Sequence, residues 1–175
     1  MKSNAGPGVN QEQEERDENA ACHTLILGIG NTLRKDDGVG ITVIDRLRDH
    51  ELPSGVGLLD GGTAGIDLLS YLEDLDRLII VDALYAEGNP GEIKVIAGDE
   101  LKERDIFLSG HYGRLSDMLD MVGALGKRPV TTIIGIIPLD CESYEMGLSP
   151  EVEKAVPGVI EMICALLAGQ SKAIL

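Results

Sequence analysis

Apolar residues along this chain follow two patterns, short uninterrupted runs and longer segments with helical spacing. The first run covers residues 24–29 and predicts a buried β-strand. The apolar residues that recur after it at intervals of three and four are Val39, Val43, Ile44 and Leu47. This spacing predicts a helix with one apolar face. A glycine turn and two adjacent acids separate the two elements, so the segment predicts a βα unit with carboxylates beyond its strand.

The same order of elements continues to the end of the chain. Further strands are predicted at residues 57–59, 77–81, 92–96 and 130–137. The alternation within 92–96 is typical of an edge or antiparallel strand. Further helices are predicted at residues 66–72, 115–125 and 150–163, the last with Ser149 as its N-cap and Pro150 at its first position. Strands that alternate with helices predict an α/β fold. We expect a three-layer α/β/α sandwich around a mostly parallel five-stranded twisted sheet with one antiparallel strand.

The beginning of the chain differs from the rest. Residues 1–21 are polar and acidic, with almost no large apolar side chains to offset the entropy of ordering. We expect a flexible acidic tail over residues 1–21. The remaining residues, 22–175, contain no internal repeat and no linker, and their length suits a single α/β domain.

Charge and composition exclude several classes of partner. The formal net charge is −15 and aromatic residues make up only 3% of the chain, so a nucleic acid would meet repulsion and few stacking surfaces. The sequence shows neither an apolar run long enough to span a membrane nor an export signal, and we expect a cytoplasmic protein without a membrane partner. Cys22, Cys141 and Cys164 fit no disulfide framework and no metal motif. We expect reduced thiols, with Cys164 in the core and Cys141 in a loop.

The glycine turn after the first strand allows two interpretations. Gly28 and Gly30 form the start of a dinucleotide-binding motif, but the third glycine is missing. Asp36 and Asp37, at the entrance to the helix, would repel a phosphate there. Two acids at this point could instead complement the helix dipole, although one acid would be enough for that. The second acid is then available for chemistry.

Three sets of polar residues follow predicted strands or precede a predicted helix. Asp36 and Asp37 come after the first strand, Asp82 follows the strand at 77–81, and His111 lies in a glycine-containing loop before a helix. The carboxyl ends of parallel strands share one edge of a sheet, so we expect these residues to meet there, with Asp82 and His111 exposed on the rim. Two carboxylates and an imidazole suit nickel, zinc, iron or manganese, and three protein ligands leave positions open for water or substrate.

Each of these residues also has a purely structural interpretation. Asp82 could cap the turn that follows its strand, and His111 could be an exposed loop histidine. We expect His23 and His50 to lie at the surface, because neither stands near a predicted strand end on the acidic side of the sheet. From spacing alone, the sequence predicts an α/β protein with a metal or acid–base cleft.

Five segments together extend this interpretation. They are GIGNTLRKDDGVG at 28–40, LDGGTAGIDLL at 59–69, RLIIVDAL at 77–84, the His111 loop, and GIIPLDCESYEMGLSP at 135–150. In this order and spacing they resemble the hydrogenase maturation endopeptidases, which trim the C-terminus from the large-subunit precursor of nickel–iron hydrogenases. The resemblance covers nearly everything after the acidic tail.

The resemblance implies a function and a set of site residues. It implies an endopeptidase that removes the C-terminal peptide of a hydrogenase large-subunit precursor after nickel insertion. The nickel is carried by the precursor and serves as the recognition element, and no organic cofactor is required. Asp37, Asp82 and His111 would be the metal ligands and catalytic residues, and the loop at 60–65 would line the substrate cleft. This chain has Asp37 where many members have Glu, and Gly110 and Tyr112 where many have Pro and Gln, so the cognate hydrogenase stays open.

Two mechanisms are compatible with these residues. In the first, the three side chains hold the substrate's nickel while a metal-bound or carboxylate-activated water attacks the peptide bond. In the second, Asp37 and Asp82 share a proton as an aspartic-protease-like pair. The sequence offers no nucleophile elbow and no Cys–His pair. A non-catalytic, nickel-sensing maturation chaperone of the same precursor would use the same three residues and is the main alternative function.

Overall fold

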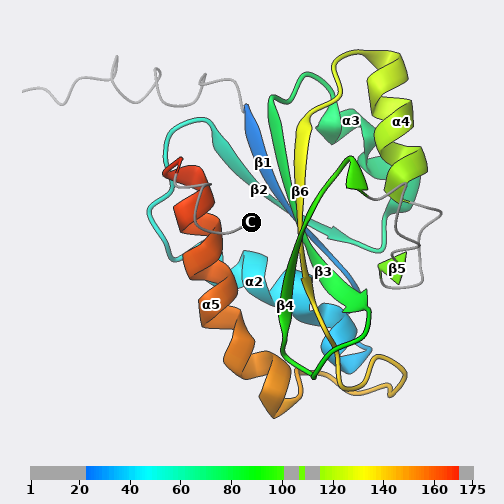
Figure 1. The fold of residues 1–175 in the computed structure, drawn as a ribbon, viewed down its shortest axis with the longest axis vertical. Coiled ribbons are helices and arrows are strands. Elements are labelled where there is room, and N and C mark those ends of the chain that lie inside the picture. Colours follow the sequence, from blue (N-terminus) through cyan, green and yellow to red (C-terminus); the bar gives the residue numbers. More distant parts are fainter. Residues whose placement is uncertain (1–22, 101–106, 109–114, 170–175) are drawn as a thin grey trace, which may run out of the picture.

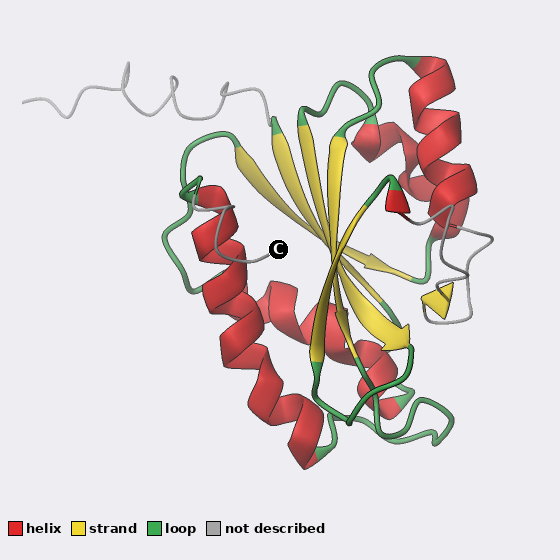
Figure 2. Ribbon diagram, in the orientation of Figure 1, coloured by secondary structure: helices red, strands yellow, loops and turns green. Residues whose placement is uncertain are grey.

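The structure is a computed structural model that describes residues 23–100, 107–108 and 115–169. The sequence prediction of a tail at residues 1–21 lies outside these residues. Figure 1 shows a twisted sheet with helices on both faces, and Figure 2 shows the same three layers by secondary structure. The predicted α/β/α sandwich is thereby confirmed.

Five strands form the main sheet in the order β2-β1-β3-β6-β4, and a sixth, β5, pairs with the end of β3. The neighbouring pairs β1–β2, β1–β3 and β3–β6 are parallel, whereas β4 runs antiparallel to β6 at the edge. This arrangement confirms the mostly parallel sheet with one antiparallel strand. The strands are β1 (Thr24–Ile29), β2 (Val56–Gly62), β3 (Arg77–Tyr85), β4 (Ile93–Ala97), β5 (Phe107–Leu108) and β6 (Val130–Ile136).

The helices divide between the two faces of the sheet (Figure 1). Apolar residues of α2 and α5 pack with Ile26 on one face, whereas those of α3 and α4 pack with Leu25 and Leu27 on the other. This alternation follows from the two-residue repeat of a strand. The helical elements are η1 (Lys35–Gly38), α2 (Val39–Leu47), η2 (Gly65–Leu68), α3 (Leu69–Leu72), α4 (Leu115–Leu125) and α5 (Pro150–Leu167). In the part of the chain that the structure describes, no helix is long and apolar enough to cross a membrane.

The glycines after β1 allow backbone to pack directly against backbone. A Cβ added to Gly28 would lie 2.4 Å from the carbonyl oxygen of Gly40, and one added to Gly40 would lie 2.3 Å from that of Val81. Gly30 turns the chain at a φ of +134°, where a Cβ would lie 1.7 Å from the carbonyl oxygen of Asp37. Helix α2 therefore lies tightly on β1 and β3, a packing that accounts for these glycines without a bound nucleotide.

Several boundaries differ from the sequence prediction. Strand β3 continues past the predicted end at residue 81 to Tyr85, because Asp82 pairs with Gly135 of β6 and the last residues pair with β5. Strand β2 likewise extends to Gly62. The expectation that Cys164 belongs to the core is wrong: the residue is exposed, because the buried stripe of α5 runs through its neighbours Ile160 and Ile163.

Candidate active site

Asp36 forms hydrogen bonds that hold the loop following β6 in place. Its side chain is fully buried and accepts hydrogen bonds from the backbone N–H groups of Leu139 at 2.9 Å, Asp140 at 3.0 Å and Ser149 at 2.6 Å. The hydroxyl of Ser149 donates a fourth bond, at 2.9 Å. All four bonds come from donors, so the carboxylate of Asp36 acts as an acceptor in each of them. Ser149 is the N-cap residue of α5 as predicted, but its hydroxyl binds Asp36 instead of capping the helix.

Asp37 is the next residue in the chain and lies, like Asp36, in the 3-10 turn η1 between β1 and α2. Its side chain is only 2% exposed, and Oδ2 accepts a hydrogen bond from the backbone N–H of Asn31 at 3.0 Å. The turn at Gly30 brings that amide back toward η1. The two adjacent acids therefore accept hydrogen bonds from different parts of the chain: Asp36 from the segment that follows β6, and Asp37 from the turn of its own βα unit.

Asp82 lies inside β3 and not beyond it. The expectation that this residue is exposed on the rim is wrong, because strand pairing with Gly135 encloses it and its side chain has no exposed surface. Its Oδ1 accepts a hydrogen bond from the N–H of Ala83 at 2.7 Å. In the two-residue repeat of the strand it lies on the same face as Ile80 and Leu84, which belong to the core under α3 and α4. Its carboxylate is thus buried within the sheet.

Cys141 connects the two candidate acids. Burial raises the pKa of its thiol to about 12, the hydrogen bond from Tyr85 opposes this rise, and the negative charges of Asp37, Asp36 and Asp82 add to it. The carboxylates come from two elements in contact, η1 with Asp36 and Asp37, and β3 with Asp82. Burial also raises the pKa of the Tyr85 hydroxyl, which is bonded to the same sulfur and lies near Asp37. Such a thiol stays protonated at neutral pH, which argues against a cysteine nucleophile.

The third predicted ligand, His111, lies outside the described residues. Among the residues that are described, no group of three or more His, Cys, Asp or Glu side chains is arranged to hold a metal ion. The other two histidines lie at the surface, as predicted: His50 is exposed, and His23 is 3.5 Å from Asp76 near the start of β3.

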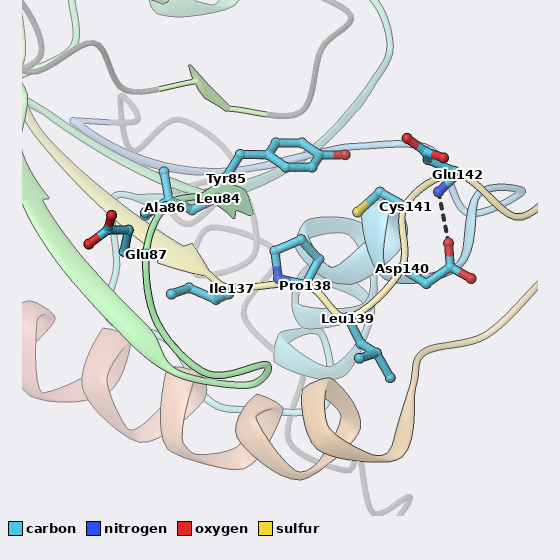
Figure 3. Close-up of a pocket in the computed structure, with 10 residues that line it drawn as sticks. All are labelled: Leu84, Tyr85, Ala86, Glu87, Ile137, Pro138, Leu139, Asp140, Cys141 and Glu142. Carbon is cyan, nitrogen blue, oxygen red and sulfur yellow. Dashed lines mark hydrogen bonds between the residues drawn. The ribbon is translucent and has the colours of Figure 1, made fainter.

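A pocket lies beside Cys141, which is one of the residues that line it. Its volume is ≈ 600 Å³, and it lies between the end of β3 and the chain that follows β6 (Figure 3). The residues that line it are Leu84, Tyr85, Ala86, Glu87, Ile137, Pro138, Leu139, Asp140, Cys141 and Glu142. Sequence reasoning did not identify these residues, because the exposure of the apolar side chains Leu139, Tyr144 and Met146 is a property of the fold. The loop at 60–65, expected to line the cleft, lies beside the Gly30 turn, where the N–H of Gly30 donates to the carbonyl of Gly62 at 3.0 Å.

The family model described as hydrogenase maturation protease (HycI) matches residues 41–166, which is more than half of the chain. The chain belongs to the hydrogenase maturation protease family. The resemblance in the sequence motifs is thereby confirmed, and so is the assignment to a family of endopeptidases.

Individual members of the hydrogenase maturation protease family are similar over most of their length. The hydrogenase 2 maturation protease of Escherichia coli is 35% identical, covering 82% of this chain and 89% of its own. The hydrogenase expression/formation protein HupD of Bradyrhizobium diazoefficiens is also 35% identical, over 82% of this chain and 77% of its own. Among solved structures, the hydrogenase maturating endopeptidase HybD from E. coli superposes with a TM-score of 0.76 at 32% identity, covering 85% of this chain and 93% of its own.

Proposed function

We propose that this maturation protease removes the C-terminal peptide from the large-subunit precursor of a nickel–iron hydrogenase after nickel insertion, in the cytoplasm. The main supporting observation is the pair of buried carboxylates, Asp37 and Asp82, which lie on η1 and β3, two elements in contact with each other. Buried carboxylates are costly to keep in a fold, and they gather where an enzyme binds a cation or transfers a proton. Membership of the family supplies the class of substrate.

In this proposal Asp37, Asp82 and His111 bind the nickel ion that the precursor carries. His111 comes four residues before α4, and α4 packs on the face of the sheet to which Asp82 belongs by strand alternation. Two carboxylates and one imidazole leave coordination positions for the ligands that already hold the ion in the precursor. The site gains this binding energy only when the precursor is loaded, so the protease distinguishes finished from unfinished substrate.

The proposed cleavage uses water as the nucleophile. Water activated at the site attacks the carbonyl carbon of the bond to be cut, and its proton passes to a carboxylate. The C–N bond then breaks, the proton moves to the leaving amine, and the products are a new carboxylate and a free amine. The two versions of this mechanism differ in what assists the attack. In one it is the substrate's nickel, and in the other it is a proton shared between Asp37 and Asp82.

The test is to incubate the purified protein with nickel-loaded and with metal-free precursor and to measure the mass of each. We expect loss of the C-terminal peptide from the loaded precursor alone. Asp82→Asn, which keeps the buried volume of the side chain, and His111→Ala are expected to lower the rate by 100-fold or more, as a lost metal ligand does. The thermal midpoint should stay within a few degrees of the wild-type value.

Three outcomes would contradict the proposal or part of it. A stable complex with loaded precursor whose mass never changes would favour the chaperone. Equal cleavage of loaded and metal-free precursor would exclude nickel as the recognition element. Unfolding of the Asp82→Asn variant would assign that residue to structure alone.

A further inference from the structure

The pocket beside Cys141 is apolar in its middle and acidic at its ends. Leu84 and Tyr85 form one side, and Ile137 and Pro138 form the other (Figure 3). Seven of its ten lining residues are apolar, three are acids, and none is a base. A volume of ≈ 600 Å³ falls within the usual range of ligand pockets, about 300–1,000 Å³, and accommodates a few residues of an extended chain.

The two outer acids lie far apart within this pocket. Glu87 follows the end of β3 and Glu142 follows Cys141, so that the carboxylates stand at opposite ends of the apolar stretch (Figure 3). Both are exposed, and neither forms an ion pair with any described residue. Asp140 differs, because hydrogen bonds from Ser143 and Glu142, aided by the charge of Lys35, hold its pKa at about 2. Lys35 also lies 3.8 Å from Asp140, so Glu87 and Glu142 are the two pocket acids that no described cation pairs with.

Among the described residues, several large apolar side chains around the pocket are exposed. Tyr85 is 48% exposed and Leu139 is 56% exposed. Tyr144 and Met146, in the loop that follows the pocket residues, are exposed as well. Large apolar side chains that cluster at a surface mark a site of interaction. The pocket residues Leu139 and Asp140 donate backbone hydrogen bonds to Asp36, the neighbour of Asp37, so an occupant of the pocket would lie next to the candidate active site.

We propose that this pocket binds a segment of the precursor chain next to the cleaved bond, made of apolar residues with Lys or Arg at its ends. The apolar residues would cover Tyr85 and Leu139, and the cationic heads would pair with Glu87 and Glu142. The pocket lacks a base, and the chain as a whole has a net charge of −15, so its field favours a basic segment over an acidic one. The inference rests on the proposed function, because it names a part of that substrate.

The first experiment measures kcat and KM for the nickel-loaded precursor with the double variant Glu87→Lys/Glu142→Lys. Its matched control is Glu73→Lys/Glu161→Lys, which makes the same change in net charge at two exposed acids outside the pocket. At low salt we expect KM to rise about tenfold in the pocket variant, with kcat changed by less than about twofold. The control should stay within about twofold of the wild type, and about 0.5 M NaCl should remove most of the difference.

Milder variants and a charge exchange test direct contact. Glu87→Gln/Glu142→Gln removes both charges without adding new ones, and KM should rise about threefold. Each Lys and Arg that flanks the cleaved bond of the precursor is then changed to Glu in turn. We expect at least one such precursor to be cut poorly by the wild type and better by the Lys variant, because only a contacting pair shows this coupling.

The inference and the proposed function fail in different ways. If the wild type cuts the precursor and the pocket variant has the same KM as its control, the inference is wrong and the proposed function stands. If the wild type never cuts loaded precursor, the proposed function is wrong; affinity of the same variants for the precursor, measured by fluorescence anisotropy, then decides the inference alone. If the wild type is a dimer that only the pocket variant dissociates, the occupant is a second copy of this chain, and the inference is overturned.

Discussion

Two adjacent aspartates at one strand end have separate tasks in this protein. Asp36 accepts four hydrogen bonds from the chain that follows β6, whereas Asp37 accepts one from Asn31 in the turn of its own βα unit. The first acid fixes the loop that contains Cys141, and the second borders the candidate site beside that thiol. Their adjacency couples the position of the loop to that of the candidate ligand. A change at Asp36 should therefore affect both stability and the site.

The substitution Asp36→Asn should lower the free energy of unfolding by about 2–4 kcal/mol. The amide keeps the volume of the carboxylate, but its NH₂ group would face backbone donors wherever it points, so buried bonds to a charged acceptor are lost. Asp49→Asn makes the same chemical change at an exposed residue and should have almost no effect. Urea unfolding followed by circular dichroism measures both variants. Equal urea midpoints for the two variants would contradict the assignment of Asp36 as the residue that stabilises the loop after β6.

At the scale of elements, the fold depends on the close contact of one helix with two strands. Helix α2 presents Gly40 to the backbone of β1 and β3, and a Cβ at this position would lie 2.4 Å from the carbonyl oxygen of Ile29 as well as against Val81. The contacting atoms belong to backbone, which cannot move aside as a flexible side chain can. The same contact sets the position of η1, and hence of Asp37, at the start of the helix.

The substitution Gly40→Ala should destabilise the protein by about 3 kcal/mol, even though alanine favours helices by nearly 1 kcal/mol over glycine. The control is Gly158→Ala in α5, where the new Cβ would lie 3.6 Å from a methyl carbon of Ile93, an ordinary contact. That variant should be more stable than the wild type by about 0.5–1 kcal/mol. Chemical denaturation of both proteins checks the pair. Stabilisation by both substitutions would show that α2 does not lie as tightly on the sheet as described.

Over the whole molecule, negative charge dominates. Asp and Glu number 30 against 15 for Lys and Arg, so the compact state brings like charges together. Most of the ion pairs among the described residues are exposed and contribute little to stability. Self-repulsion should therefore exceed the attraction of these pairs, and both are screened by salt.

Raising NaCl from about 0.02 M to about 0.3 M should increase the thermal midpoint by about 3 °C, because screening relieves more repulsion than attraction. The Glu73→Lys/Glu161→Lys variant, in which the net charge changes from −15 to −11, should show a smaller increase in the thermal midpoint. Differential scanning calorimetry measures both. A midpoint that decreases with salt would mean that ion pairs outweigh repulsion in this fold.

The sequence predicted the elements more reliably than their ends. The apolar run at residues 24–29 is β1, and the helical spacing from Val39 to Leu47 is α2. The end of β3 was placed too early, because a lone acid after four apolar residues was interpreted as the end of a buried strand. Strand pairing holds Asp82 inside the sheet instead. No local pattern shows whether a carboxylate is enclosed by partners that come from elsewhere in the chain.

The order of elements, the parallel sheet and the family were all determined by the sequence alone, because apolar periodicity and motif spacing are local properties of the chain. The tertiary structure alone decided that Asp36 binds the loop after β6, that Asp82 is buried within a strand and that a pocket lies beside Cys141. Each of these depends on residues about fifty to more than a hundred positions apart, such as Asp36 and Ser149. Contacts of that range arise when the sheet forms and β3 and β6 lie side by side, and local spacing does not encode which side chains then meet.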